Sequence, residues 1–422
     1  MNTRSNRVIY IGLWLLVMTV FFILPGLASA AGLWLYEQGT PDSGMATAGR
    51  AALASDASTV GANPAGMTRL ERSELLVGFA GLDVNAKFDI SSANRSGGNG
   101  GNAGSFVPAG SLSYAHKLSP DLSIGIGAAS YFGLGLDYDD DWAGRYYSQE
   151  AELVTFAVNP GIGYRVNEQF SIGAGVSIVY GKLYQEIAVN NLAGRPDGQL
   201  KLDEDDIGYG FNMGVLYEPI RGTRFGLTYR SEVDLEFKDT ANAKGILPPL
   251  TLLTGKKVDL DLTIPQAVML SGYHQLTDKL ALTANLGWQD WSTFGKQEFT
   301  IKDQSSTSLT VDKDYDDTWH YAVGARYRIS IPWLLSLGFA YDSSPVDDRT
   351  QNSPDLALDS QYRYACGLQY DWNQNVTVGV AYEYIDLGEG KLEQSGTLSG
   401  DLAGKYDPFH VHVISLNMAW KF

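Results

Sequence analysis

His410-Val-His-Val-Ile-Ser-Leu-Asn-Met-Ala-Trp-Lys-Phe422, at the C-terminal end of the sequence, reads as a strand with two unlike faces. With a period of two residues, one face carries the apolar side chains of Ile414, Leu416, Met418, Trp420 and Phe422. The other face carries the polar side chains of Ser415, Asn417 and Lys421. A strand with an apolar outer face and a polar inner face is typical of a membrane β-barrel, because lipid-facing and lumen-facing residues alternate along it. This stretch therefore predicts an all-β membrane protein, with a soluble β-sandwich as the alternative.

Residues 73–422 repeat this pattern of alternating strands separated by connectors. Short turns, such as 119–121 and 277–279, alternate with long connectors, such as 239–256 and 388–409. Outer-membrane barrels have tight turns at one end and extended loops at the other. Counting strands between the connectors predicts an antiparallel transmembrane barrel of about fourteen strands.

Residues 1–30 predict a cleaved secretory signal peptide. Arg4 and Arg7 precede an apolar run, and Ala28-Ser29-Ala30 supplies small residues at the cleavage position. An uncleaved membrane anchor is the alternative, because the apolar run is long for a signal peptide. We expect the mature chain to begin at Ala31.

Residues 31–72 do not alternate and are rich in Ala, Gly and Ser. Asp42 and Ser43 are suited to cap a helix over residues 44–54. Small side chains favour close packing inside another structure. We therefore predict that residues 31–72 form a helical hatch that plugs the lumen of a barrel formed by residues 73–422.

Composition and motifs exclude several classes of function. The formal net charge is −17, which argues against nucleic acid as a partner, because phosphates require a basic surface. The five histidines lack the spacing of a metal site, and no Gly-x-Ser-x-Gly motif is present. We predict no metal, no cofactor and no enzymatic activity. Acidic stretches such as 137–141 and 312–317 lack the glycine and glutamate of a calcium loop, so we interpret them as solvated loops beside lipopolysaccharide.

The connector at residues 245–254 is strongly apolar for an outer loop. Exposed apolar patches usually mark binding surfaces. The alternative is that its side chains pack on neighbouring loops. The residues predicted to capture a hydrophobic ligand are Ile246, Leu247, Leu250, Leu252 and Leu253.

Two blocks near the start of the mature chain resemble the opening of the FadL family. They are Ala48-Gly49-Arg50-Ala51-Ala52 and Asn63-Pro64-Ala65-Gly66-Met67-Thr68. The segment Phe132-Gly133-Leu134-Gly135 is also similar to the family. This family comprises bacterial outer-membrane transporters of long-chain fatty acids and of hydrocarbons such as toluene. The resemblance implies a plugged barrel of fourteen strands that imports hydrophobic molecules passively.

The resemblance also implies a route through the protein. A ligand is captured among outer loops, passes to a pocket in the lumen, and leaves sideways through a gap in the barrel wall. The gap lies at an inward kink of the third strand, which corresponds here to Tyr131, Phe132 and Gly133. The kink faces the hatch residues Asn63, Pro64 and Ala65.

Two further positions bear on the ligand. The family's basic pocket residues correspond to Lys182 and Asp316, and an acid at the second position would repel a carboxylate. The resemblance thus leaves long-chain fatty acids and neutral hydrocarbons both open as substrates. A general porin, an adhesin or structural barrel and a barrel enzyme are the more distant alternatives.

The end of the chain also resembles an assembly signal. Trp420 and Phe422 fit the C-terminal pattern that the outer-membrane barrel assembly machinery reads. We expect a monomer in contact with outer-membrane lipid and lipopolysaccharide.

Overall fold

The computed structural model describes residues 33–34, 36, 38–130, 132–191, 194–240, 242–248, 257–302 and 307–422. The predicted signal peptide lies outside these ranges. No helix within them is both long and apolar enough to cross a membrane.

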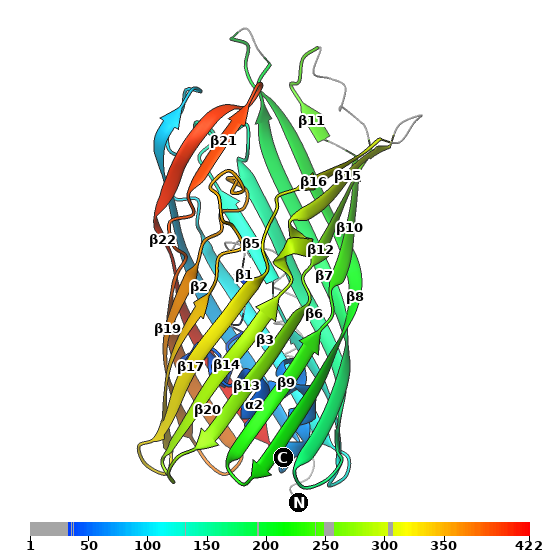
Figure 1. Ribbon diagram of the computed structural model, residues 1–422, viewed down its shortest axis with the longest axis vertical. Helices are drawn as coiled ribbons and strands as arrows, with labels where there is room; N and C mark the ends of the chain where they lie inside the picture. Colours follow the sequence, from blue (N-terminus) through cyan, green and yellow to red (C-terminus); the bar gives the residue numbers. More distant parts are fainter. Residues whose placement is uncertain are drawn as a thin grey trace, which may run out of the picture.

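Antiparallel strands that follow one another in the chain form a closed barrel (Figure 1). They are β2 (Glu74–Ala93), β3 (Phe106–Lys117), β4 (Leu122–Ala129), β5 (Phe132–Asp137), β6 (Glu150–Arg165), β7 (Phe170–Val189), β8 (Gly198–Ile220), β9 (Thr223–Arg230), β13 (Ala267–Gln275), β14 (Leu280–Gln289), β17 (Thr318–Arg328), β18 (Trp333–Asp342), β19 (Gln361–Asp371), β20 (Val376–Asp386) and β22 (Gly400–Lys421). Because β4 and β5 are two parts of one barrel strand, the described chain forms a barrel of 14 strands. Pairing of β2 with β22 closes it. The predicted fold class is confirmed.

The C-terminal strand has the predicted two faces. Ile414 and Leu416 are 60% and 55% exposed, whereas Ser415 and Asn417 between them are buried. Successive side chains of a strand point to opposite faces, and only the inner face is covered by the contents of the lumen. Ile414 and Leu416 are therefore exposed on the outer face. The barrel therefore presents an apolar outer surface, as a lipid-facing wall requires.

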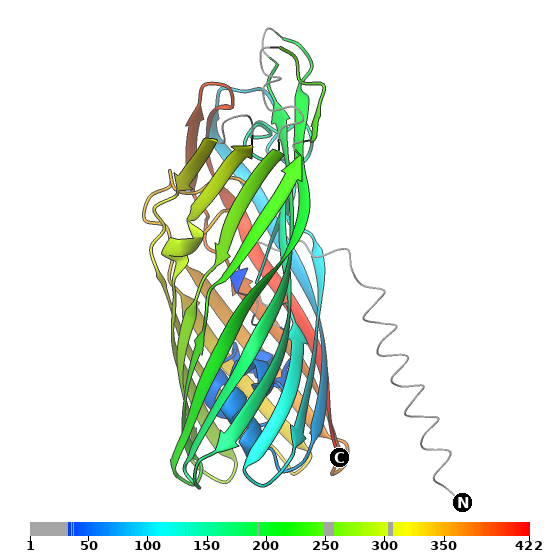
Figure 2. The same cartoon turned by 90° about the vertical axis from the view of Figure 1, so that its right-hand side faces the viewer.

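A second sheet extends from the end of the barrel that carries the long connectors (Figures 1 and 2). Its strands are β10 (Val233–Thr240), β12 (Lys257–Ile264), β15 (Lys296–Lys302) and β16 (Thr307–Asp312). Val233 and Leu235 of β10 pack where β7 and β8 have glycines, Gly181 and Gly208. The sheet therefore lies against the inner face of β7 and β8 and covers an apolar interior.

The remaining elements are short. They are β1 (Leu33–Trp34), η1 (Pro41–Met45), α2 (Arg50–Leu53), α3 (Thr59–Ala62), η2 (Pro64–Arg69), β11 (Asn242–Lys244), α4 (Trp291–Phe294) and β21 (Leu392–Gly396).

Residues 38–72 lie inside the barrel, near the end that carries the short turns (Figures 1 and 2). We call this segment the plug. The predicted continuous helix over 44–54 is wrong, because the chain forms η1 and α2 with a break between them. Ala46, Thr47 and Gly49 have positive φ angles at this break. The plug turns here to follow the inner surface of the wall, where Met45 packs against Gly338.

Candidate functional site

The outer half of the lumen contains a buried apolar cluster, which we call the apolar core. It joins side chains of the wall, the second sheet and α4. Its members include Phe132, Leu153, Val179, Leu183, Val233, Leu235, Phe237, Leu260, Leu262, Ile264, Trp291, Phe294, Tyr315, Leu356, Leu358 and Tyr36. Such an interior suits the apolar part of a ligand.

The barrel wall is interrupted beside this core. β3 pairs with β4 only over Ser111–Lys117, and β4 ends at Ala129. The chain then turns inward, so that the Phe132 ring lies 6.0 Å from the Trp291 ring and 5.2 Å from the Phe294 ring. Thr155 holds this turn, because its Oγ1 donates to the Phe132 carbonyl at 2.7 Å. We call the interruption between β3 and β5 the wall break.

The wall break occurs where the family resemblance predicts a kink. Phe132 and Gly133 begin β5, and Gly133 pairs across the sheet with Val154 of β6. Tyr131 lies outside the described residues. The Phe132 side chain points inward, and its ring is fully buried.

The edge of β5 at the wall break is covered by residues 33–34. Leu33 and Trp34 form β1 and pair with Gly133 and Phe132. Nearby, Gln38 Nε2 donates to the Ser130 carbonyl at 3.2 Å. The N-terminal segment therefore takes the place that the upper part of β3 leaves empty.

Asn63, Pro64 and Ala65 do not meet this edge, in contrast to the expectation from the family. They lie against inward-facing glycines of β6, β7 and β8, including Gly173 and Gly214. Asn63 is fully buried, and its Nδ2 donates to the carbonyls of Ala51 at 2.7 Å and Val215 at 3.0 Å. The block therefore ties the plug to β6, β7 and β8, the strands that follow β5 in the wall.

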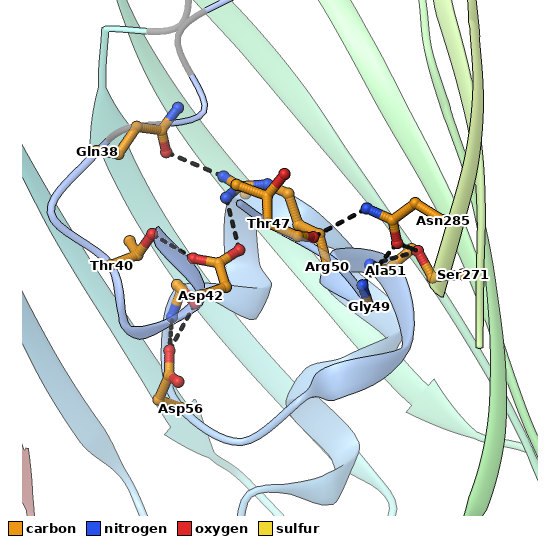
Figure 3. A network of polar contacts seen from close by, with 12 residues as sticks. Gln38, Thr40, Asp42, Thr47, Gly49, Arg50, Ala51, Asp56, Ser271 and Asn285 are labelled. Carbon is orange, nitrogen blue, oxygen red and sulfur yellow. Dashed lines mark hydrogen bonds and ion pairs between the residues drawn. The ribbon is translucent and has the colours of Figure 1, made fainter. Parts of the chain in front are cut away.

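Two wall residues satisfy backbone groups of the plug near α2 (Figure 3). Asn285 Oδ1 accepts from the Gly49 N–H at 2.7 Å, and its Nδ2 donates to the Thr47 carbonyl at 2.9 Å. Ser271 Oγ accepts from the Ala51 N–H at 3.1 Å. The first N–H groups of a helix have no partner within it, so polar wall side chains are needed to bury this short helix.

A polar cluster separates the plug from the apolar core. Gln289 Nε2 donates to Tyr36 Oη at 2.8 Å. Asp342 is 2.7 Å from His320 Nδ1 and accepts from Arg363 Nε at 3.0 Å. The Arg363 guanidinium lies 5.4 Å from the centre of the Tyr36 ring. Tyr36 thus belongs to both the apolar core and this polar cluster.

A partly buried cation lies at the outer side of the apolar core. Lys313, in the connector between β16 and β17, donates from Nζ to Ser353 Oγ at 2.9 Å and lies 3.6 Å from Asp355. Burial is the largest single effect and disfavours its charge, but Asp355 and Tyr315 together outweigh it and raise the pKa of Lys313. Tyr315, two residues on, belongs to the core, and burial raises its pKa to about 12. Lys313 therefore keeps a positive charge next to apolar side chains.

The predicted pocket residues Lys182 and Asp316 are not brought together. The Lys182 side chain is 46% exposed on the outward face of β7 and lies 3.5 Å from Asp203. Asp316 is exposed, and the carboxylate of Asp347 raises its pKa. Neither is a member of the apolar core. Lys313, three residues before Asp316, lies beside the core in an ion pair with Asp355.

The predicted capture residues are described only in part. Leu247 is 37% exposed, and its backbone N–H donates to Asn191 Oδ1 at 2.9 Å. Ile246 packs on Gly198 of β8. Leu250, Leu252 and Leu253 lie outside the described residues.

At the other end of the barrel lie the residues of the predicted assembly signal. The ring of Phe422 lies 5.7 Å from that of Trp420.

Sequence reasoning missed Lys313, Tyr36 and Trp291. Lys313 could have been found as a single cation between acidic residues. Nothing local marked Tyr36 or Trp291, because the N-terminal segment and α4 carry them into the lumen from distant parts of the chain.

The chain is similar to known proteins along nearly its whole length. Residues 22–422 match the family described as outer membrane protein transport protein (OMPP1/FadL/TodX). The chain belongs to this family. It is 28% identical over 459 residues to outer membrane protein P1 of Haemophilus influenzae, covering 96% of this chain and 98% of that protein. It is 29% identical over 396 residues to a long-chain fatty acid transport protein of Escherichia coli, covering 85% and 87%.

Solved structures of the FadL family share the fold. A Pseudomonas aeruginosa FadL homologue superposes with a TM-score of 0.84 at 22% identity, covering 93% of this chain and 100% of that one. The Pseudomonas putida toluene transporter TodX gives a TM-score of 0.68 at 16% identity, covering 94% and 99%. At these identities the likeness concerns the fold alone.

Membership of the FadL family places the protein in the bacterial outer membrane, as predicted. It is a transporter of hydrophobic molecules. Members of the family are transporters and channels, which fits the prediction that the chain is not an enzyme.

Proposed function

We propose that this protein imports long-chain fatty acids passively and releases them sideways through the wall break. The observation that carries the proposal is Lys313, a charged side chain that is 14% exposed and lies beside the apolar core. A fatty acid matches this arrangement, because its chain is apolar and its carboxylate accepts charge-assisted hydrogen bonds. The E. coli relative named as a long-chain fatty acid transport protein supports the same substrate class.

The apolar core provides the driving force for binding. Each methylene group removed from water contributes about 0.8 kcal/mol, so a long acyl chain gains several kcal/mol before entropic costs. Ile246 and Leu247 on the outer loops, with Leu250, Leu252 and Leu253, would make the first contact. Transport then needs no energy source, because the ligand moves between successive apolar sites.

Two routes out of the core differ in polarity. Towards the short turns, beside the plug, lies a cavity of about 460 Å³ lined by charged groups that include Arg326, Arg328, Glu74 and Asp371. Entry there would bring an acyl chain into contact with a polar surface. The wall break is bordered by Phe132 and, on β3, by the 63% exposed Phe106. The apolar route at the wall break therefore supports lateral exit.

Lys313→Gln is the variant that tests the substrate class. Oleate uptake is expected to fall about ten-fold, because a hydrogen bond to a charged group contributes about 1.5–3 kcal/mol. Toluene uptake is expected to stay unchanged. The measurement is whole-cell uptake of both labelled compounds in a host that lacks such a transporter.

Lys182→Gln is the matched control, because it removes an outward-facing lysine. Unchanged oleate uptake in Lys313→Gln would overturn the proposed role of this residue. The double variant Lys313→Gln/Asp355→Asn repeats the test without leaving the Asp355 carboxylate unpaired.

Asn63→Ala is expected to reduce uptake without reducing the amount of assembled barrel. The change removes the amide that donates to Ala51 and Val215, so the plug loses a contact with β8. Uptake and heat-modifiable migration on gels measure transport and assembly separately. Normal uptake in the folded variant would refute a role for this block in transport.

A neutral aromatic or aliphatic hydrocarbon is the second candidate substrate. It is favoured by Asp355, which already lies within 3.6 Å of Lys313 and offsets its charge. Toluene uptake by the wild type without oleate uptake would select this alternative.

We further propose that the protein functions as a monomer in contact with outer-membrane lipid and lipopolysaccharide. Trp420 and Phe422, at the end of β22, would form the signal read by the barrel assembly machinery. Their place on the strand that closes the barrel supports this role.

A further inference from the structure

A small cavity lies between the plug and the wall, on the inner side of the apolar core. Its volume is about 60 Å³, and strands β8, β9 and β13 of the barrel wall form one side of it. Its lining includes Arg50 and Gln38 from the N-terminal segment and Arg230 from β9. The cavity exceeds the 10–15 Å³ or so that one water needs, so it has room for a carboxylate group.

The cavity has one polar side and one apolar side. Ala267 and Met269 of β13 line it and also pack against the apolar core. Tyr36 lines it and is a member of the core. Ala267, Met269 and Tyr36 therefore form an apolar border that the cavity shares with the core.

The polar side is formed by two guanidinium groups held in place by the plug, and Figure 3 shows that of Arg50. Arg50 Nη1 donates to Asp42 Oδ2 at 2.7 Å, and its Nη2 donates to Gln38 Oε1 at 3.1 Å. Arg230 Nη2 donates to the Gly61 carbonyl at 3.3 Å. Planar guanidinium groups bind carboxylates through paired hydrogen bonds, which makes arginine the preferred partner of a buried carboxylate.

We propose that this cavity is a second binding site, specific for the carboxylate end of an acyl chain, with Arg50 and Arg230 as its partners. The proposal rests on the function proposed above. Lys313 lies on the side of the apolar core towards the long connectors, and Arg50 and Arg230 lie on the side towards the plug. A ligand that enters among the long connectors therefore meets Lys313 first and the arginines second.

Occupation of this site acts on the wall break through Gln38. The same Gln38 side chain accepts from Arg50 and donates to the Ser130 carbonyl beside the break. A carboxylate on Arg50 competes with Asp42 and Gln38 for the guanidinium. Binding therefore weakens the contact that holds the N-terminal segment at the break.

Two substitutions with opposite expected effects on decanoate affinity, Asp42→Asn and Arg50→Gln, test the site. Asp42→Asn and Arg50→Gln break the same ion pair, so any loosening of the plug is common to both. Asp42→Asn leaves Arg50 unopposed and is expected to tighten decanoate binding several-fold. Arg50→Gln removes a partner and is expected to weaken it about ten-fold. Binding of decanoate and of decanol to the purified full chain in dodecyl maltoside is measured by titration calorimetry.

Arg230→Gln is a second variant that leaves the Asp42–Arg50 pair intact and is also expected to weaken decanoate binding about ten-fold. Arg326→Gln is the matched control, because this arginine lines the cavity on the short-turn side. Decanol affinity is expected to be equal in all variants.

Changes of the same sign in Asp42→Asn and Arg50→Gln, or equal losses for decanoate and decanol, would overturn the site. Unchanged decanoate binding in Arg50→Gln and Arg230→Gln would do the same. Wild-type cells that fail to take up oleate would refute the proposed function instead. In that case Asp42→Asn would still be expected to tighten decanoate binding by the purified protein, and Arg50→Gln to weaken it.

Discussion

Gly338→Leu is expected to convert a nearly closed barrel into an ion-conducting one. A Cβ atom at this position of β18 would lie 1.9 Å from the Met45 carbonyl carbon of the plug. Such close contacts do not occur, so either the plug or the wall must move. The wall is held by continuous pairing of β18 with β17 and β19, whereas η1 is a short helix. The plug is therefore the part that shifts.

Planar-bilayer recordings of purified protein measure this effect. We expect the single-channel conductance to rise about ten-fold or more, with a loss of stability of about 1–3 kcal/mol, which is typical of overpacking. Gly272→Leu is the matched control, because a side chain there meets no atom within 4 Å. Equal conductance in the two variants would show that residues 38–72 do not plug the lumen.

A disulfide between Leu33→Cys and Gly133→Cys is expected to stop uptake of the transported ligand. These residues face one another in the β1–β5 pair, and directly opposed Cα atoms lie within the range of a disulfide. Oxidation would fasten the N-terminal segment across the wall break. Uptake is expected to fall to the level of cells without the protein and to recover after reduction.

The experiment is done with Cys366→Ser, so that no other thiol is present. Val215→Cys with Leu227→Cys is the control pair, because it links β8 and β9 within an intact ladder. Uptake that persists through the oxidised Leu33–Gly133 bond would argue that the ligand leaves by another route. The charged cavity beside Arg326 would then be the first alternative to test.

The barrel could be predicted from the sequence alone. Alternation along stretches such as residues 410–422 identifies which face meets lipid, because side chains of a strand point to opposite sides in turn. Small residues in 31–72 predicted a segment that packs closely inside another structure. These features are local, so one sequence suffices to detect them.

The same parity could have placed Lys182. It shares its face of β7 with Ile178 and Tyr180, which are exposed on the outer surface. A shift of one residue moves a side chain from the lumen to the outside. A family correspondence displaced by a single residue therefore assigns a side chain to the wrong face of the wall, so the resemblance did not place Lys182.

The residues that gather inside the barrel are apparent only in the folded protein. Tyr36, Gln289 and Lys313 come from the N-terminal segment, a strand end and a connector, and no local pattern relates them. The fold also set Asn63 against β8 and left Leu33 and Gln38 at the wall break. The physical reason is that the plug follows the inward-facing glycines of the wall, whose effect appears only when both surfaces are in contact.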